Sequence, residues 1–350
     1  MGEARPQLPR RGTVAIDSLI ISIIMVRDTR LDSIKGLLII LVIMGHLIIA
    51  LDNYNFINHS VMGLIYIFHM PLFILISGYL TKHPDRQTPR QMWKSVGNIL
   101  ITLLIFQAIS ILRFYYLRGD ILQPIRMFPF GILWYLMCLI WWRIMLYYTP
   151  KPLLNRPLLY LIIAIVVSML SGVFHFGSFL AVQRTLNFYF FFLLGFYYRQ
   201  GTFNVPLWHN NKLHAVVLVV LLPLLLWLYP RCGNIMNGAD YYGIAGLPQK
   251  AMVLMCSIPM TLLMFNVIPD IKLLRPIGKD SLFYYLYHIL FIGIVTVPLV
   301  KHYGLPRMLP FILLYTAFTL LALVLLHKIP LLRWLTRPTF KKKPKAVAKE

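Results

Sequence analysis

Charged side chains are scarce in this chain. Asp, Glu, Lys and Arg make up 13% of its 350 residues and 59% are hydrophobic, whereas about a quarter of a soluble globular protein is charged. So few charges cannot cover a water-exposed surface, and this excludes an ordinary soluble domain. Apolar runs of bilayer-spanning length recur instead. The composition predicts an all-α polytopic membrane protein, a bundle of about ten transmembrane helices.

Cysteine is also rare. Two of the three cysteines, Cys138 and Cys256, lie in apolar runs, and Cys232 has no obvious partner. This count excludes a disulfide framework. We also expect no metal site and no permanently bound cofactor.

Acidic residues are few, with 11 Asp and Glu against 34 Lys and Arg, which gives a net charge of +23. A basic chain can indicate a nucleic-acid partner. Here the basic residues flank apolar segments and do not form one patch, as in loops on the cytoplasmic side of a membrane. We therefore expect the lipid bilayer, and no nucleic acid, as a partner.

Ten apolar segments follow one another, separated by short polar breaks that contain Pro or Gly. Segment 185–198 is shorter than the roughly 17–25 residues of a simple crossing, so it is less tilted, extended into its neighbours, or re-entrant. The predicted spans are 36–52, 60–80, 96–117, 128–148, 153–173, 185–198, 214–230, 248–268, 281–300 and 308–327.

Lys and Arg are unevenly distributed between the two sets of loops. With the N-terminus inside, 26 of the 34 fall in cytoplasmic segments, and the other eight, among them Arg184 and Lys250, lie outside or at outer helix ends. Both termini are therefore predicted to be cytoplasmic. We divide the chain into an N-terminal arm (1–26), a membrane domain (27–330) and a basic cytoplasmic tail (331–350). The arm has a weak signal-peptide pattern, or else translation starts at Met25, and the sequence leaves both open.

Three histidines lie within predicted spans, where an ionisable side chain usually marks function. Lys35 and His46 are eleven residues apart, about 16 Å along a helix and on one face. His69 should reach a similar depth from the opposite direction, with His288 somewhat nearer the inner face. Three imidazoles at comparable depth predict a polar cavity, although each alone could be a histidine bonded to a carbonyl. Arg113 and Arg143 lie near helix ends, where they can snorkel to the interface.

Two further patterns concern the helices around these histidines. Pro71 lacks an N–H, which frees the carbonyl of Ile67. Gly45 and Gly78 allow helices to approach closely.

The stretch "RDTRLDSIKG" precedes the first span and spaces Asp28, Asp32 and Lys35 as on a helix. One interpretation is a helix start capped by Ser33 or Asp32 with an Asp–Lys pair. The other is a cytoplasmic anion site in which Arg30 and Lys35 lie at a positive helix end.

Four motifs resemble those of the integral-membrane acyltransferase family (acyltransferase 3, including fucose 4-O-acetylase-like O-acetyltransferases). "RLDSIKGLLIILVIMGH" resembles its opening signature and "FHMPLFILISGYL" its second-span motif. "LWYLMCL" and "GKDSLFYYLYH" resemble its later, less specific motifs. The resemblance covers residues about 27 to 330. Many members have Arg where this chain has Lys35, and the loop "TKHPDRQTPRQMWK" lacks a clean Arg-rich match.

The resemblance implies transfer of an acetyl or other acyl group from cytoplasmic acyl-CoA, a co-substrate, to a hydroxyl of a cell-envelope sugar or polysaccharide. The acceptor is free or lipid-linked, and the location is the bacterial cytoplasmic (inner) membrane. The family histidine maps to His46, as general base or acyl carrier. The other expected site residues are His69 and His288 (catalytic), Arg30, Asp32, Lys35, Lys82 and Arg86 (donor-binding), and Trp134, Tyr135 and Tyr285 (acceptor path).

Two other classes of function fit parts of the sequence. A transporter or flippase for a glycan or small anion would use the histidines as a proton relay. It would usually show internal symmetry, which we do not see. A structural envelope protein would explain neither the buried histidines nor the motif spacing.

Overall fold

The computed structural model describes residues 28–51, 55–174, 176–177, 179–202, 214, 216–224, 235, 238 and 242–338. These residues form helices and turns, and no strand occurs among them. The α-helices are α2 (Thr29–Ala50), α3 (Phe56–Tyr79), α4 (Pro89–Arg118), α5 (Leu122–Arg126), α6 (Trp134–Tyr147), α7 (Lys151–Leu154), α8 (Pro157–Leu170), α9 (Val182–Arg199), α11 (Leu247–Val267), α12 (Arg275–Lys279), α13 (Ser281–Phe291), α14 (Val297–His302), α15 (Leu309–Leu326) and α16 (Pro330–Thr336).

The described part of the chain contains eight helical segments that are long and apolar enough to cross a membrane. The predicted span 153–173 corresponds to the shorter apolar helix α8. The predicted span 214–230 lies partly outside the described residues, as do the arm (1–26) and most of the tail (331–350). The all-α polytopic membrane fold is therefore confirmed.

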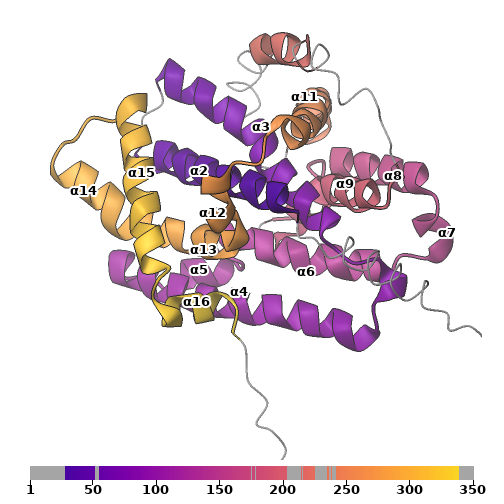
Figure 1. Ribbon diagram of the computed structural model, residues 1–350, viewed down its shortest axis with the longest axis horizontal. Coiled ribbons are helices and arrows are strands. Elements are labelled where there is room, and N and C mark those ends of the chain that lie inside the picture. The colour runs from indigo at the N-terminus through magenta and orange to yellow at the C-terminus, as the bar shows by residue number, and fades with distance from the viewer. Residues whose placement is uncertain are drawn as a thin grey trace, which may run out of the picture.

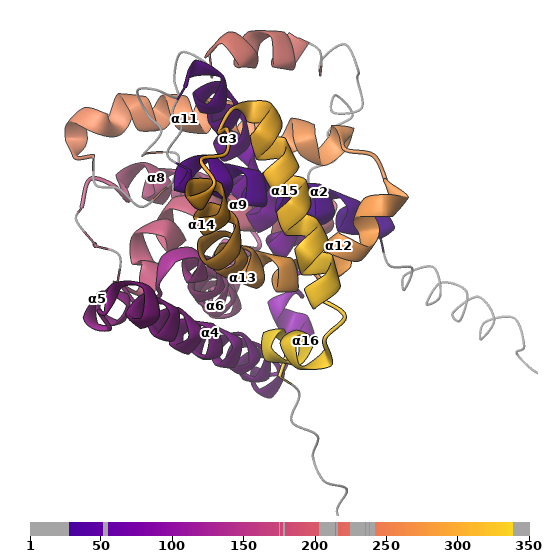
Figure 2. The same ribbon diagram turned by 90° about the vertical axis from the view of Figure 1, so that its left-hand side faces the viewer.

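Helices α2 and α3 form the centre of the bundle, and α9, α11, α12, α13 and α15 pack around them. The helix α4 runs along the periphery beside α6 (Figures 1 and 2). Many large apolar side chains of α4 and α15 are exposed, as expected for lipid-facing helices. The polar groups discussed below lie inside this arrangement.

The first helix begins earlier than the sequence indicated. Asp28 is the N-cap, and its carboxylate accepts a hydrogen bond from the N–H of Arg30 at 3.0 Å. The predicted caps, Ser33 and Asp32, are instead inside the helix. Ser33 donates to the carbonyl of Pro269, so its hydroxyl is used in a tertiary contact. The predicted Asp32–Lys35 ion pair is present at 2.8 Å.

The short predicted span 185–198 is a full-length helix. It extends N-terminally into the 3₁₀ turn Phe179–Ala181, which gives a 21-residue segment. Of the three alternatives, extension into the neighbouring residues is the one observed. The polar residues Gln183 and Arg184 interrupt the apolar run, so the sequence did not indicate the first turn of this helix.

Glycines allow two pairs of helices to touch at the backbone. A Cβ at Gly78 would lie 1.9 Å from the carbonyl oxygen of Phe192, between α3 and α9. A Cβ at Gly278 would lie 1.6 Å from the carbonyl oxygen of Asp32, between α12 and α2. The close approach predicted for Gly78 is confirmed, whereas Gly45 faces the ring of Tyr66.

One end of the bundle, here called the Arg30 end, gathers the segments that the charge count assigned to the cytoplasm. Thr29 donates to Asp270 at 2.6 Å, and Lys151 pairs with Asp85 at 3.3 Å. Other links between these segments are Arg199 to the carbonyl of Tyr79, His83 stacked on Phe196, and Asp280 with His327 and Arg337. The grouping agrees with the prediction, and which side of the membrane it faces stays a prediction.

The opposite end, here called the Arg307 end, joins the end of α2 to the segment before α15. Arg307 donates to the carbonyl of Leu51 at 3.2 Å, and the side chain of Asn58 donates to the carbonyl of Arg307 at 3.4 Å. The two ends are thus tied by different sets of polar contacts.

Candidate functional site

A cavity of about 530 Å³ lies inside the bundle and receives two of the three predicted histidines, His46 and His69. Its walls come from α2, α3, α9 and α13, and its rim from the connecting segments before α6 and α9. Those segments join the ends of α4 and α8 that lie away from the Arg30 end. A cavity is therefore present where the histidine spacing predicted one, but its lining is mostly apolar and His288 does not line it.

His46 projects from α2 and is half-buried. Its Nδ1 lies 2.9 Å from the carbonyl oxygen of Val42, one turn earlier. Because a carbonyl only accepts hydrogen bonds, Nδ1 carries the hydrogen, and in the neutral ring Nε2 keeps its lone pair. The imidazole is thus held by its own helix with a basic nitrogen left for chemistry.

The other two histidines are held in the same way. His69 Nδ1 lies 2.8 Å from the carbonyl oxygen of Ile65, and His288 Nδ1 lies 2.6 Å from that of Tyr285. The rings of His46 and His288 meet edge to face with centroids 4.9 Å apart. His288 is fully buried, and its Nε2 has no hydrogen-bond partner among the described residues. The structure therefore brings His46 and His288 into contact, with His69 across the same cavity.

The three aromatic residues predicted for the acceptor path form one cluster. Trp134 and Tyr285 line the cavity, and Tyr135 lies directly behind them, 5.4 Å from Tyr285 between ring centroids. The Tyr135 hydroxyl is 2.6 Å from that of Ser77, and the Tyr285 hydroxyl donates to the carbonyl of Ile132. The phenol groups are thus engaged within the protein, which leaves ring surface and not hydroxyls for a ligand.

The turn at the cavity wall includes two residues in the left-handed backbone region, of which Ala181 lines the cavity. Leu180 and Ala181 have φ of 54° and 52°, which costs a non-glycine residue about 1–2 kcal/mol each. Contacts on both sides hold this turn: Leu180 N–H donates to the carbonyl of Phe128 at 2.8 Å, and the Trp141 indole donates to the carbonyl of Leu180 at 3.1 Å. The turn starts α9 at the cavity, so Gln183 and Arg184 line it.

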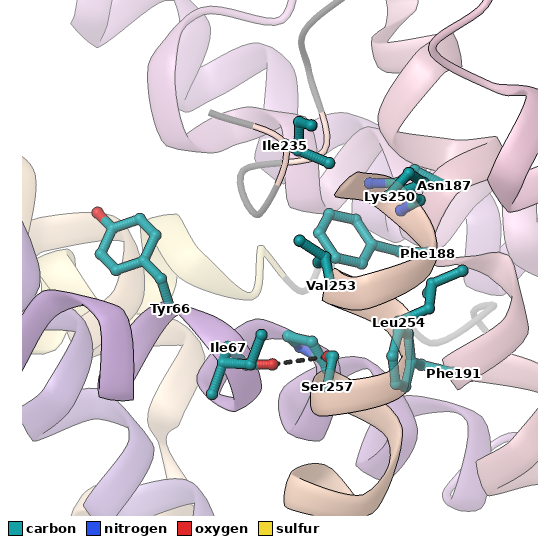
Figure 3. Close-up of a pocket in the computed structure, with 11 residues that line it drawn as sticks. Tyr66, Ile67, Asn187, Phe188, Phe191, Ile235, Lys250, Val253, Leu254 and Ser257 are labelled. Atoms are coloured by element: carbon teal, nitrogen blue, oxygen red, sulfur yellow. Dashed lines mark hydrogen bonds between the residues drawn. The ribbon is translucent and has the colours of Figure 1, made fainter. Parts of the chain in front are cut away.

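A second, much smaller cavity of about 10 Å³ shares Tyr66 and Phe188 with the first. Figure 3 shows Lys250 next to Asn187 on one side and Tyr66 across from them. Lys250 is 2% exposed and donates to the side-chain oxygen of Asn187, although the sequence placed it at an outer helix end. A space of this size holds one water molecule at most, so it is too small for a substrate.

Figure 3 also shows the outcome of the prediction for Pro71. Ser257 on α11 donates to the carbonyl of Ile67 at 2.6 Å, the carbonyl that Pro71 leaves without a helical partner. The helix α3 continues through Pro71. The freed carbonyl therefore ties α3 to α11 behind His69.

A third cavity, of about 310 Å³, opens at the Arg30 end between α4, α6 and the loop after α3. Arg143 donates to Ser95 at the cavity wall, and the Arg143 Nε is buried with no hydrogen-bond partner in the part of the chain that the structure describes. Lys82 also lines this cavity, and no Asp or Glu is among the described residues that do so. The sequence missed this site because Arg143 lies one turn from a helix end, where snorkelling was the simpler expectation.

The predicted donor-binding residues do not form one cluster. Arg30 donates to the carbonyls of Phe265, Asn266 and Ile268, and so caps the C-terminus of α11. Asp32 is buried and pairs with Lys35, and neither lines the histidine cavity or the cavity at the Arg30 end. Lys82 does line the cavity at the Arg30 end, and Arg86 is exposed on the adjoining turn Pro84–Arg86.

Beside Arg30, the loop after α11 carries a bidentate ion pair. Arg275 donates to both oxygens of Asp270, at 2.7 and 2.5 Å. These hydrogen bonds, helped by one from Thr29, lower the pKa of the Asp270 carboxyl, and the pair raises the pKa of Arg275. The pair fixes the loop against the start of α2. Among the described residues, no group of three or more His, Cys, Asp or Glu could hold a metal ion.

Comparisons with known proteins give the following. The family described as "Acyltransferase domain" matches residues 28–327. The nodulation protein NolL of Sinorhizobium fredii (strain NBRC 101917 / NGR234) is 43% identical over 82 residues, which is 23% of this chain and 22% of that protein. The chain thus spans about a fifth of that relative. No solved structure matches.

Proposed function

The chain belongs to this acyltransferase family and is a multi-pass membrane acyltransferase, and from this premise we propose the finer activity. It transfers an acetyl or other acyl group from cytoplasmic acyl-CoA to a hydroxyl of a cell-envelope sugar or polysaccharide. The observation that carries the proposal is His46, held by Val42 and facing a 530 Å³ cavity with its Nε2 lone pair available. The bacterial source of the matched relative supports a bacterial inner membrane.

His46 supplies what a sugar hydroxyl lacks. At neutral pH a hydroxyl is a poor nucleophile, and a positioned imidazole can take its proton as attack proceeds. The hydroxyl oxygen attacks the thioester carbonyl carbon, and His46 Nε2 takes the hydroxyl proton. The carbon–sulfur bond then breaks, and the thiolate leaves with that proton from the imidazolium. The products are the O-acyl sugar and free CoA.

The cavity at the Arg30 end suits the polar part of the donor. Arg143 and Lys82 supply positive charge, and the described lining has no carboxylate to repel phosphates. Ser77 and Tyr135 lie between this cavity and the histidines, since Ser77 is on the same helix as His69 and bonds to Tyr135. We propose that Lys82 and Arg143 bind donor phosphates, that Arg86 joins them when the donor is bound, and that the acyl arm passes Tyr135. Arg30 caps the C-terminus of α11 and Asp32 pairs with Lys35, and their donor-binding role stays a prediction.

Labelled acetyl-CoA and a panel of glycan acceptors, added to membranes containing the protein, test the activity. We expect transfer that falls by about 10²–10⁴-fold in His46→Ala, the usual contribution of a general base. His302→Ala, at an exposed histidine on α14, is the matched control and should retain activity. If no acceptor is labelled above the His46→Ala background, the proposal fails. Uptake of glycan by sealed vesicles without transfer would favour the transporter.

A second experiment separates a base from an acyl carrier. Without acceptor, a carrier accumulates label on the protein after a rapid quench, and the label is lost in His46→Ala. If His46 acts only as a base, no burst of free CoA occurs without acceptor, and the protein carries no label. Arg143→Gln should raise the KM for acetyl-CoA about tenfold while kcat at saturation changes little, because Arg143 is far from the reacting atoms.

A further inference from the structure

Resting on the proposed function, one feature of the histidine cavity indicates what kind of acceptor enters it. Arg184 is the charged residue among the described residues that line the cavity, and no Asp or Glu accompanies it there. A cavity with one fixed positive charge and no carboxylate favours an anion over a cation or a neutral ligand of the same shape. The other polar lining groups are His46, His69, Gln183 and three aromatic side chains.

The guanidinium of Arg184 is positioned by an aromatic stack. Its guanidinium lies over the ring of Trp134, 4.8 Å from the ring centroid. Trp134 in turn stacks on Phe188, one helical turn after Arg184, with 5.7 Å between centroids. When an arginine stacks on an aromatic ring, its N–H donors point outward from the edge of the guanidinium. There they can bind carboxylate or phosphate oxygens. The guanidinium is therefore pre-positioned at the cavity wall.

The start of α9 adds to this positive potential. Ala181, the N-cap, is in the left-handed region and provides no side-chain hydrogen bond to the first turn. Gln183 and Arg184 belong to that turn and line the cavity. A helix N-terminus carries a partial positive charge from its N–H groups, so the strained turn directs this charge and Arg184 to the same place.

This end of the cavity is distinct from the donor side. Arg184 and Arg199 are fifteen residues apart on α9, about 22 Å along the helix. Arg199 lies at the Arg30 end, where it donates to the carbonyl of Tyr79. A ligand held by Arg184 therefore approaches His46 from the side opposite to Arg143 and Lys82.

We propose that Arg184, with the N-terminus of α9, is an acceptor-specificity residue that binds an anionic group of the sugar acceptor, a carboxylate or a phosphate. The acceptor is then an acidic or phosphate-bearing saccharide whose free hydroxyl reaches His46. Arg184 binds the acceptor's charge, and the histidine performs the proton transfer.

Three probes with one sugar ring test this: methyl glucoside, its uronate (methyl glucuronide) and glucose 1-phosphate. The melting temperature of the purified protein in detergent is measured with each probe. Transfer of labelled acetyl to each probe is measured separately. We expect one or both anions to raise the melting temperature more than methyl glucoside does, and to be preferred at least tenfold in kcat/KM. The stronger anion distinguishes a carboxylate from a phosphate.

Variants identify Arg184 as the cause. Arg184→Gln should abolish the preference for the anion, with the KM for acetyl-CoA unchanged, and Arg184→Lys should restore part of it. Arg118→Gln, at an exposed arginine at the end of α4, is the matched control. Equal effects of all three probes on the wild type overturn the inference, as does an Arg184→Gln protein that keeps its preference. Equal transfer to the neutral and charged sugars would overturn this inference but still support the proposed acyltransferase activity. If no probe is acetylated, the melting experiment still decides.

Discussion

The imidazole rings of His46 and His288 meet edge to face, with centroids 4.9 Å apart, although they come from helices near opposite ends of the chain. His288 is fully buried behind His46, and its Nδ1 is held by the backbone of its own helix. His46 borders the cavity, whereas His288 does not. We therefore expect His288 to act as a positioning residue that fixes the ring plane of His46.

Replacing His288 should affect the rate more than substrate binding. We expect His288→Ala to lower kcat by about 10–100-fold with little change in the KM for acetyl-CoA, because the ring of His46 loses its lateral support. His288→Phe keeps an aromatic ring and should retain more activity than His288→Ala. The dependence of kcat/KM on pH should keep its shape in both variants. A change in its limiting slopes would show that His288 itself exchanges a proton in the reaction.

The bond between Ser257 and Ile67 should respond to the residue at position 71. Ser257→Ala leaves the Ile67 carbonyl without its partner, which should destabilise the protein by about 1–2 kcal/mol. In a Pro71→Ala background the new N–H can bond to Ile67, so the same change should cost less. Melting temperatures of the four proteins form a double-mutant cycle. Additive effects would show that the serine does not compensate for the proline.

The backbone contact between α2 and α12 predicts a severe effect of one methyl group. Gly278→Ala places a Cβ against the carbonyl of Asp32, and we expect a loss of about 2–3 kcal/mol from overpacking. Gly97→Ala is the control, because its Cβ would meet nothing within 4 Å. A helical alanine there should leave stability unchanged or raise it by up to about 1 kcal/mol. Thermal melting in detergent measures both, and similar melting temperatures would contradict the contact.

The ion pair of Asp270 with Arg275 predicts the direction of a pH effect on stability. Hydrogen bonds from Arg275 lower the pKa of Asp270 in the folded protein. Its stabilisation is therefore full above the unfolded pKa of about 3.9 and is lost as the pH falls through the lower folded value. Wild-type protein should lose stability between pH 5 and 3 more steeply than Asp270→Asn. Identical slopes would show that this pair does not contribute.

The left-handed turn before α9 gives a test of strain. Ala181→Gly relieves the unfavourable φ but increases the freedom of the unfolded chain, so stability should stay equal or rise by up to about 1 kcal/mol. Ala181→Val introduces a β-branched residue at φ 52° and should destabilise by more than 1 kcal/mol. Melting temperatures of the three proteins measure this. A valine variant as stable as the wild type would show that the turn is not fixed.

Sequence patterns predicted what depends on periodicity and on the length of apolar runs. The helical membrane fold, the placing of His46 and His69 at one cavity, and the freed carbonyl of Ile67 all follow from patterns along single helices. The family resemblance also points to His46. These features are local or need only the rule that helices alternate in direction.

What the sequence did not predict depends on contacts between distant segments. The cap that Arg30 makes on α11 was not predicted, because no local pattern shows that the end of another helix lies against it, and its donor-binding role stays a prediction. Lys250 was expected outside or at an outer helix end, and its burial beside Asn187 near the start of α11 was not predicted. Arg184 was counted among the outer basic residues, since a strained turn at Leu180 and Ala181 has no signature in residue type.

The hydrogen bond from His46 Nδ1 to the carbonyl of Val42 limits how the acyl group can travel. While that bond is kept, the ring cannot rotate about its side-chain torsions, and Nε2 stays at one point relative to α2. A carrier of the swinging-arm kind, which takes a group at one side and delivers it at the other, is then impossible for His46. Both substrates must come to the same stationary nitrogen, and any long-distance transport of the acyl group falls to the flexible arm of the donor.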